Sequence, residues 1–178
     1  MVQEKKGFIN KIFNKLQTHS KPEIVFLIGL PGSGKSSFLK QGIQEKRFQN
    51  YKICSTDQYI DFVASLRKKT YDDVFDEVYP DAEKQFFKLI DESVKQNQNM
   101  VIDRTNCSIQ DRKKILERIP SYYKKRAIVF GVPQDELKKR LNVRANATGK
   151  VISEEVLQSM INKYEHPTHK EFDHMERY

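Results

Sequence analysis

Short apolar runs alternate with longer amphipathic stretches from Glu23 onward, and this alternation predicts βαβ units around a parallel sheet. Strands are expected at Ile24–Ile28, Tyr51–Ser55, Met100–Asp103 and Arg126–Val132. Helices are expected at about Gly34–Lys46, Gln58–Lys68, Asp81–Gln96, Ile109–Glu117, Gln134–Ala145 and Ser153–Tyr164. We therefore expect an α/β fold over residues 22–178, in which a parallel sheet is sandwiched between helices.

Residues 1–21 have a separate pattern, in which apolar side chains recur at helical spacing among lysines. The apolar positions are Phe8, Ile9, Ile12, Phe13 and Leu16. This pattern predicts a basic amphipathic helix. The sequence leaves open whether its apolar face packs on the domain, binds a partner protein or lies on a membrane surface.

The length of 178 residues suits one domain of ordinary size. The longest clean apolar run, Ile24–Ile28, is far shorter than the roughly 18 residues of a membrane span, and the first ten residues have no signal-peptide pattern. We expect a soluble, intracellular protein, cytoplasmic or nuclear, without a transmembrane segment. Cys54 and Cys107 are too few for a disulfide framework and are expected to be inert core thiols.

The net charge of +8 is unevenly distributed along the chain. Arg104–Lys150 carries thirteen basic and four acidic residues, whereas Cys54–Asn99 carries six basic and ten acidic ones. A concentrated positive charge favours a surface that attracts polyanions, nucleic acid among them. An ordinary solvated surface is the alternative.

A phosphate-binding motif follows the first predicted strand directly. The segment Gly29-Leu30-Pro31-Gly32-Ser33-Gly34-Lys35-Ser36-Ser37 satisfies G-x-x-x-x-G-K-[ST] and precedes a predicted helix. Its glycines allow the backbone to wrap around a polyphosphate, to which Lys35 adds a charge and Ser36 a ligand for Mg²⁺. The residues expected to bind the nucleotide here are Gly29, Gly32, Ser33, Gly34, Lys35, Ser36 and Ser37. The segment predicts binding of ATP or GTP with Mg²⁺.

Acidic residues follow two other predicted strands, where an open α/β sheet binds its ligands. Asp103 is expected to hold Mg²⁺ opposite Ser36, and the residues after it, Arg104, Thr105 and Asn106, face the same crevice. Asp57 is placed to accept the proton of an attacking hydroxyl, or to cap the helix that follows it. Arg140 and Arg144, four residues apart on one helix, suit a cationic lid over a phosphoryl group.

Four segments of the chain resemble the P-loop polynucleotide kinases, which transfer the γ-phosphoryl group of ATP to a 5′-hydroxyl end of RNA or DNA. They are GLPGSGKSS, STDQY, VIDRTNCSIQDRKK and LKKRLNVRANATGKVISEEVLQSM, and the similarity covers about Glu23 to Thr168. The resemblance implies a P-loop NTPase fold with an arginine-bearing lid, and ATP and Mg²⁺ as cofactors. Lys35, Asp57 and Arg144 match the family's catalytic residues. The family's characteristic segment at Arg104, Thr105, Asn106 and Arg112 implies substrate binding there.

Two departures from that family concern the acceptor strand. Ile60 and Arg104 stand where the phage-type enzyme has an arginine and an acid. We therefore keep two further hypotheses beside a polynucleotide kinase. One is a kinase of a small hydroxyl compound such as a nucleoside, sugar or sugar-nucleotide, as in zeta-toxin-like relatives. The other is a non-catalytic nucleotide- or RNA-binding module.

Overall fold

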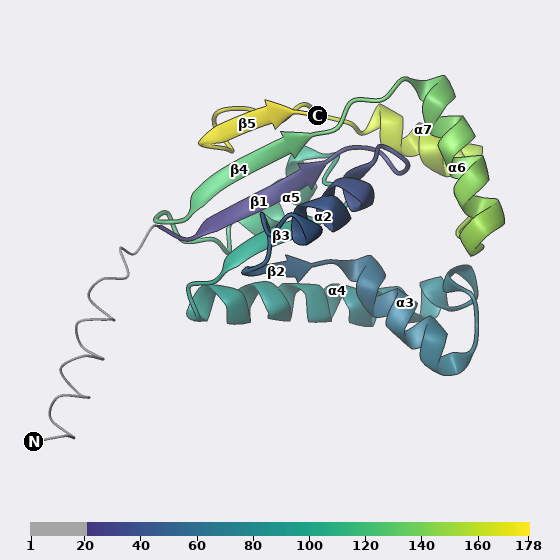
Figure 1. Ribbon diagram of the computed structural model, residues 1–178, viewed down its shortest axis with the longest axis horizontal. Coiled ribbons are helices and arrows are strands. Elements are labelled where there is room, and N and C mark those ends of the chain that lie inside the picture. The colour runs from purple at the N-terminus through teal and green to yellow at the C-terminus, as the bar shows by residue number, and fades with distance from the viewer. Residues whose placement is uncertain (1–20) are drawn as a thin grey trace, which may run out of the picture.

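Five parallel strands form one sheet in the part of the chain that the structure, a computed structural model, describes, residues 21–178. They are β1 (Glu23–Ile28), β2 (Tyr51–Cys54), β3 (Asn99–Asp103), β4 (Lys124–Val129) and β5 (His174–Arg177). Their order across the sheet is β2-β3-β1-β4-β5 (Figure 1). The predicted parallel sheet is confirmed, with a fifth strand at its edge that the sequence pattern did not predict.

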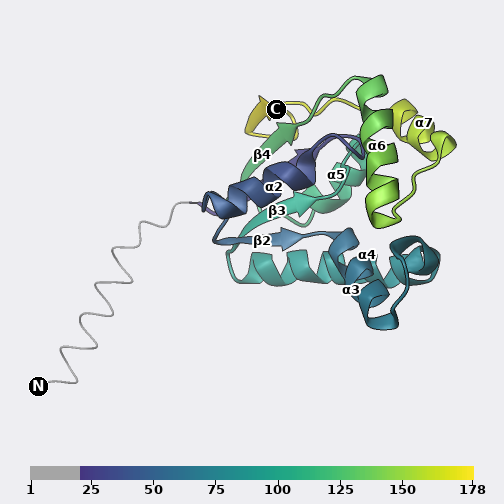
Figure 2. The same ribbon diagram turned by 45° about the vertical axis from the view of Figure 1, so that its right-hand side comes forward.

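Helices connect the strands and cover both faces of the sheet (Figures 1 and 2). They are α2 (Lys35–Gln44), α3 (Thr56–Arg67), α4 (Tyr71–Lys95), α5 (Ile109–Leu116), α6 (Gln134–Thr148) and α7 (Glu154–Asn162). None of the helices within residues 21–178 is both long and apolar enough to cross a membrane. The amphipathic helix predicted for residues 1–21 lies outside the described residues apart from Lys21.

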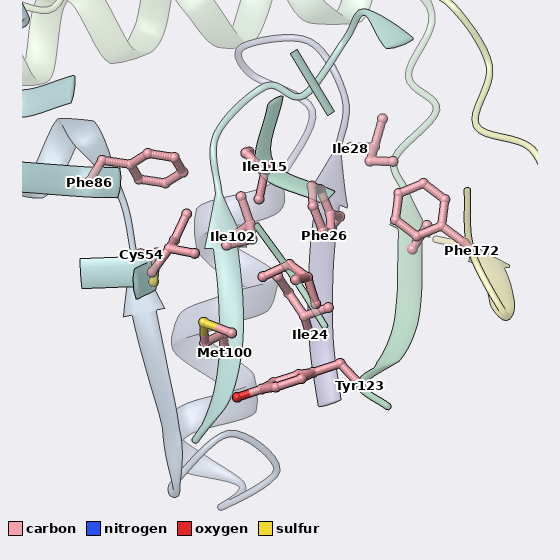
Figure 3. Packing of buried hydrophobic residues seen from close by; sticks show 13 residues of the cluster. Ile24, Phe26, Ile28, Cys54, Phe86, Met100, Ile102, Ile115, Tyr123 and Phe172 are labelled. Atoms are coloured by element: carbon pink, nitrogen blue, oxygen red, sulfur yellow. The ribbon is translucent and has the colours of Figure 1, made fainter. Parts of the chain in front are cut away.

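Successive residues of β1 point to opposite faces of the sheet and are buried on both, as expected of a central parallel strand. Val25 and Leu27 pack with Phe38 and Leu39 of α2 on one face. The other face holds the larger cluster, which α4 and α5 cover (Figure 3). Its labelled members are Ile24, Phe26, Ile28, Cys54, Phe86, Met100, Ile102, Ile115, Tyr123 and Phe172. Packing of the two clusters on its two faces fixes the position of β1, and therefore the position of the loop that follows it.

Helix α4 is ten residues longer at its start than the predicted Asp81–Gln96. Thr70 and Asp73 form a capping box in which each side chain accepts a hydrogen bond from the other residue's backbone N–H. The next turns bury Val74 and Val78 against α3. Pro80 lies inside the helix but is exposed, so the backbone hydrogen bond that it cannot donate is missing on the outer side. The extension makes an α3–α4 hairpin that projects past the sheet (Figure 2).

Both cysteines are buried and unpaired, as predicted for core thiols. Burial raises the pKa of the Cys54 thiol to about 12 and also raises that of Cys107. Both thiols therefore stay protonated near neutral pH.

The register of the sheet places the ends of four strands side by side. Leu27 of β1 pairs with Asp103 of β3, and Ile28 pairs with Val129 of β4. Cys54 of β2 pairs with Ile102, so the segment after β2 also begins at this edge. All the loops that carry predicted site residues therefore leave the sheet along one edge.

Candidate active site

The loop between β1 and α2 has a backbone that requires glycine at three positions. Gly32 and Gly34 have φ of 80° and 100°, in the left-handed region that side chains disfavour. At Gly29 a Cβ would lie 2.7 Å from the Ser33 Oγ and 3.0 Å from the Phe130 Cβ. The loop therefore curves tightly enough to point backbone N–H groups inward at a bound anion.

Helix α2 begins at Lys35 with an N-terminus whose backbone donors remain available. Gly34 is its N-cap, so there is no side-chain cap, and the first turn carries no acidic residue. The unpaired N–H groups and the helix dipole together favour a phosphate at this position. Ser36 and Ser37 are exposed in the first turn. The local structure is that of an anion site.

The Lys35 side chain is buried beneath this loop. Its Nζ donates hydrogen bonds to the carbonyl oxygens of Gly29 at 2.7 Å and Leu30 at 2.9 Å, and it lies 3.4 Å from the Ser33 Oγ. Burial lowers the pKa of Lys35 to about 8. The Asp103 and Asp57 carboxylates act against this shift, while Arg144 adds to it. Four predicted site residues thus lie within electrostatic range of one another.

We expect the affinity for ATP to fall as the pH rises above about 8, the pKa of Lys35. Only the charged ammonium attracts the phosphates, so binding must take up a proton wherever the free side chain is neutral. Between pH 7 and pH 9 the Kd for a fluorescent ATP analogue should rise about tenfold. Lys35→Arg keeps its charge at pH 9 and serves as the control, for which a flat profile is expected. A flat profile for the unaltered protein would contradict the prediction.

Asp57 lies in the first turn of α3 and is exposed. The N-cap of α3 is Ser55, so Asp57 does not cap this helix as the alternative interpretation had it. Instead, the Asp57 Oδ1 accepts a hydrogen bond of 2.9 Å from the Tyr71 hydroxyl at the start of α4. The α3–α4 hairpin thus holds one oxygen of the carboxylate, at the same edge as the loop that buries Lys35.

Asp103 ends β3 and is partly buried. Burial raises its pKa, the Lys35 ammonium lowers it and the Asp57 carboxylate raises it. The described residues contain no group of three or more His, Cys, Asp or Glu side chains that could hold a metal ion by themselves. An oxygen pair such as Asp103 with the Ser36 hydroxyl fits Mg²⁺, which is typically held by one or two protein ligands and substrate phosphates.

Helix α6 lies against the phosphate-binding loop and carries both predicted lid arginines. A Cβ at Gly32 would touch the Leu141 side chain at 3.3 Å, and the Cβ position of Gly34 lies 4.0 Å from the Arg140 Nη1. Arg140 is also paired with Glu136 at 2.8 Å. Arg144 acts on the pKa values of Lys35 and Tyr71 alike, lowering both. Arg144 is therefore within electrostatic range of both the loop and the α3–α4 hairpin.

The tip of the lid contacts the α3–α4 hairpin, an arrangement that the sequence did not predict. The Lys150 Nζ lies 2.7 Å from the Asp61 carboxylate and 4.1 Å from the centre of the Tyr71 ring. The Val151 N–H donates to the Asp72 Oδ2 at 2.9 Å. Figure 2 shows α6 running from the end of β4 toward this hairpin. The lid therefore bridges the site from the loop side to the Asp57 side.

Two of the residues predicted to bind substrate after β3 remain at this edge. Arg104 is partly exposed, donates to the Tyr79 hydroxyl at 2.9 Å and lies 4.9 Å from the centre of the Phe86 ring. Thr105 is partly exposed and its carbonyl oxygen accepts from the Gly29 N–H at 3.0 Å. The backbone of this segment thus holds the beginning of the phosphate-binding loop.

Asn106 and Arg112 point into the protein, which corrects their predicted substrate contacts. Asn106 is 3% exposed and its Nδ2 donates to the Leu27 carbonyl oxygen at 2.8 Å. Arg112 is fully buried, pairs with Glu171 at 2.7 Å and donates to the carbonyl oxygens of Asn106, Cys107 and Glu165. A guanidinium with all these partners is shielded from any substrate. Both residues support the loop after β3 instead.

A cavity of about 280 Å³ opens beside the ends of β4 and β5. Its lining residues are Val129, His166, Pro167, His169, Met175, Glu176 and Arg177. Val129 pairs with Ile28, the last residue before the phosphate-binding loop. The cavity is therefore one strand away from that loop.

Comparisons with known proteins give a consistent picture of the fold. A family model described as an AAA domain matches residues 24–167. A protein of the PezAT chromosomal toxin–antitoxin system of Streptococcus pneumoniae superposes with a TM-score of 0.68 at 17% identity, over 100% of this chain and 77% of that one. A gluconokinase from Sinorhizobium meliloti gives a TM-score of 0.52 at 17% identity, over 88% and 82%. The architecture is that of the α/β P-loop kinases.

A third similar structure belongs to the Pnkp1/Rnl/Hen1 RNA repair complex. It shares 26% identity with this chain, and the TM-score is 0.62. The match covers 84% of this chain but only 46% of the other, so this chain spans less than half the length of that protein.

Proposed function

Since the chain belongs to the AAA domain family, which the match over residues 24–167 establishes, we propose that it transfers the γ-phosphoryl group of ATP to the 5′-hydroxyl end of RNA or DNA. The observation that carries the proposal is the cluster of charges around one site. The Lys35 ammonium is in electrostatic range of the Asp57 carboxylate and of Arg144. These are the charges that phosphoryl transfer to a hydroxyl requires.

The proposed reaction is an in-line displacement at the γ-phosphorus. The acceptor oxygen forms a bond to phosphorus, and the bond between phosphorus and the β,γ-bridging oxygen breaks, so that its electron pair leaves with ADP. The proton of the acceptor hydroxyl passes to the Asp57 carboxylate. Lys35 and Arg144 stabilise the negative charge on the oxygens of the transferring group, and Arg140 adds positive charge beside Gly34.

Ser36 and Asp103 would hold Mg²⁺ between them. When bound, the ion neutralises charge on the β- and γ-phosphates. Asp103 suits this role because it ends β3, whose last residue pairs with Leu27 just before the phosphate-binding loop, and a carboxylate oxygen is a ligand that Mg²⁺ prefers. The cavity lined by His166 and Pro167 lies one strand away from the phosphate-binding loop, and we assign it to the nucleobase.

Three observations support a polynucleotide as the acceptor. The segment Arg104–Lys150, with thirteen basic and four acidic residues, has a strong net positive charge, which suits a phosphate backbone. Arg104 lies partly exposed at the site edge. The similar structure at 26% identity is part of an RNA repair complex. Ile60 is fully buried between α3 and α4, so it provides no grip on the acceptor strand.

A small hydroxyl compound is the second candidate acceptor, favoured by the closed lid. Lys150 and Val151 contact the α3–α4 hairpin that carries Asp57, an arrangement that suits a compact acceptor better than a strand. The gluconokinase likeness shows the shared fold alone.

Label transfer from γ-labelled ATP tests the proposal directly. The acceptors are a 5′-hydroxyl oligonucleotide, the same oligonucleotide with a 5′-phosphate, and a panel of nucleosides and sugars including gluconate. We expect label only on the first, because the phosphorylated twin has the same backbone charge but lacks the acceptor hydroxyl. The Asp57→Asn protein, prepared in parallel, excludes a contaminating kinase.

Other outcomes decide between the alternatives. Label on a small compound, with both oligonucleotides unlabelled, would replace the polynucleotide acceptor with the second candidate. ATP binding without label on any acceptor would leave a nucleotide-binding module.

A further inference from the structure

Tyr71 connects the lid to the carboxylate proposed as the base. Its hydroxyl donates to the Asp57 Oδ1 at 2.9 Å, and the Lys150 ammonium lies 4.1 Å from the centre of its ring. The three residues come from α4, α3 and the segment after α6. The three residues are far apart in the sequence, and the folding of the α3–α4 hairpin and of the lid brings them together.

We propose that Tyr71 is a positioning residue that orients the Asp57 carboxylate, and that Lys150 makes this orientation depend on closure of the lid. The inference rests on the proposed function, in which Asp57 accepts the acceptor's proton. With Oδ1 held by Tyr71, the other oxygen of the carboxylate is left to receive that proton. A group fixed in one orientation loses less entropy in the reaction than one that rotates freely.

The hydroxyl of Tyr71 remains a donor throughout the neutral range. Burial and the neighbouring Asp57 carboxylate raise the pKa of Tyr71 above its ordinary value, and Asp61 adds to this. Arg144 acts in the opposite direction. Because the phenol keeps its proton, it can act on Asp57 only as a hydrogen-bond donor.

Two polar contacts hold the Lys150 segment against the hairpin, one from its side chain and one from the backbone of the next residue. Its Nζ pairs with Asp61 at 2.7 Å, and the neighbouring Val151 N–H donates to Asp72 at 2.9 Å. The Lys150 side chain is 17% exposed, so its interaction with the Tyr71 ring is partly desolvated and stronger than at an open surface. When the lid opens, the ring loses its cation and the hairpin loses both polar contacts.

A rival interpretation makes the opposite prediction. The Tyr71 hydroxyl would occupy the place of the acceptor hydroxyl on Asp57 and would have to leave before reaction. Removing the hydroxyl would then raise activity or leave it unchanged. If Tyr71 orients the base, removal lowers the rate of the chemical step.

The test compares Tyr71→Phe, Lys150→Met and the double variant, using the acceptor that the unaltered protein labels. Tyr71→Phe keeps the ring under Lys150 and removes only the hydroxyl. Tyr122→Phe is the matched control, because Tyr122 also donates to a side chain, Asn97 at 2.7 Å, but near the opposite edge of the sheet. We measure kcat, the KM of the acceptor and the Kd of an ATP analogue.

We expect Tyr71→Phe to lower kcat about ten- to a hundredfold. The Kd of ATP should change less than about twofold, and Tyr122→Phe should match the unaltered protein. Lys150→Met should also lower kcat. In the Tyr71→Phe background it should lower kcat by a smaller factor, because Lys150 is proposed to act on Asp57 through the Tyr71 hydroxyl, which that variant lacks. An unchanged or higher kcat for Tyr71→Phe would overturn the positioning role and favour the rival interpretation. Independent effects that multiply in the double variant would overturn the role of Lys150.

Asp57→Asn is measured in the same experiment, so that failure of this inference can be distinguished from failure of the proposed function. Loss of activity in Asp57→Asn with full activity in Tyr71→Phe overturns the inference alone. Full activity in Asp57→Asn overturns both, since there is then no base to orient.

Discussion

Replacement of Asp57 by Asn is expected to lower kcat by about a hundred- to ten-thousandfold, the usual contribution of a general base. The substitution preserves the shape of the side chain, and its Oδ1 still accepts the hydrogen bond that Tyr71 donates at 2.9 Å. What it removes is the capacity to take a proton. The Kd of ATP should change far less than kcat, because Asp57 lies on α3, outside the phosphate-binding loop that precedes α2, and acts on Lys35 through its charge alone. Steady-state label transfer measures kcat, and titration with the nucleotide measures the Kd of ATP.

Asp76→Asn is the matched control for this substitution. Asp76 is an exposed residue of α4, on the same hairpin as Asp57, and has no place in the proposed site. It should leave kcat unchanged. Equal activity of Asp57→Asn and the unaltered protein would rule out Asp57 as the proton acceptor.

Replacement of Arg112 by Met is expected to reduce the free energy of unfolding by about 3–5 kcal/mol, the range found when one partner of a buried ion pair is removed. The Glu171 side chain, 12% exposed, would lose the guanidinium that neutralises it. The carbonyl oxygens of Asn106, Cys107 and Glu165 would lose a shared donor. Urea unfolding at neutral pH measures the change.

Arg118→Met is the control, since it breaks an ion pair of similar geometry near the surface. Arg118 lies 2.8 Å from Asp91, and both side chains are more than 40% exposed. Solvent weakens such a pair, so a loss below about 1 kcal/mol is expected. Similar losses for both variants would contradict the structural role given to Arg112.

The phosphate-binding loop was predictable in detail because every part of it is local in sequence. The strand before Gly29, the glycines with positive φ and the helix that begins at Lys35 lie within a few residues of one another. Asp103 was predictable for a related reason, since the carboxyl ends of parallel strands share an edge and β3 is the neighbour of β1. Local geometry and this rule together place Lys35, Ser36 and Asp103 at the same edge of the sheet.

Burial was not predictable for Arg112, because its partner Glu171 lies 59 residues further along the chain. From sequence, the resemblance to the polynucleotide kinases implied that Arg112 contacts a substrate. The structure shows that the same charge is neutralised inside the protein. A sequence pattern gives the chemistry of a side chain but not its direction.

The start of α4 was missed, because the predicted helix began at Asp81, directly after Pro80, whereas the real helix continues through this proline. A signal was available in Thr70 and Asp73, which have the spacing of a capping box. That error also concealed Tyr71, which the earlier helix start places beside Asp57. Strand β5 was missed because four residues at a sheet edge give too short a pattern to recognise.

The hydrogen bonds that Lys35 donates to Gly29 and Leu30 have a consequence for how the protein receives its first ligand. The ammonium already ties the curved backbone together from within, so little conformational entropy remains to be lost when a triphosphate arrives. The incoming oxygens instead compete with two carbonyl groups for one cation. Binding of the triphosphate then requires Lys35 to exchange backbone carbonyl oxygens for phosphate oxygens, while the loop keeps its conformation.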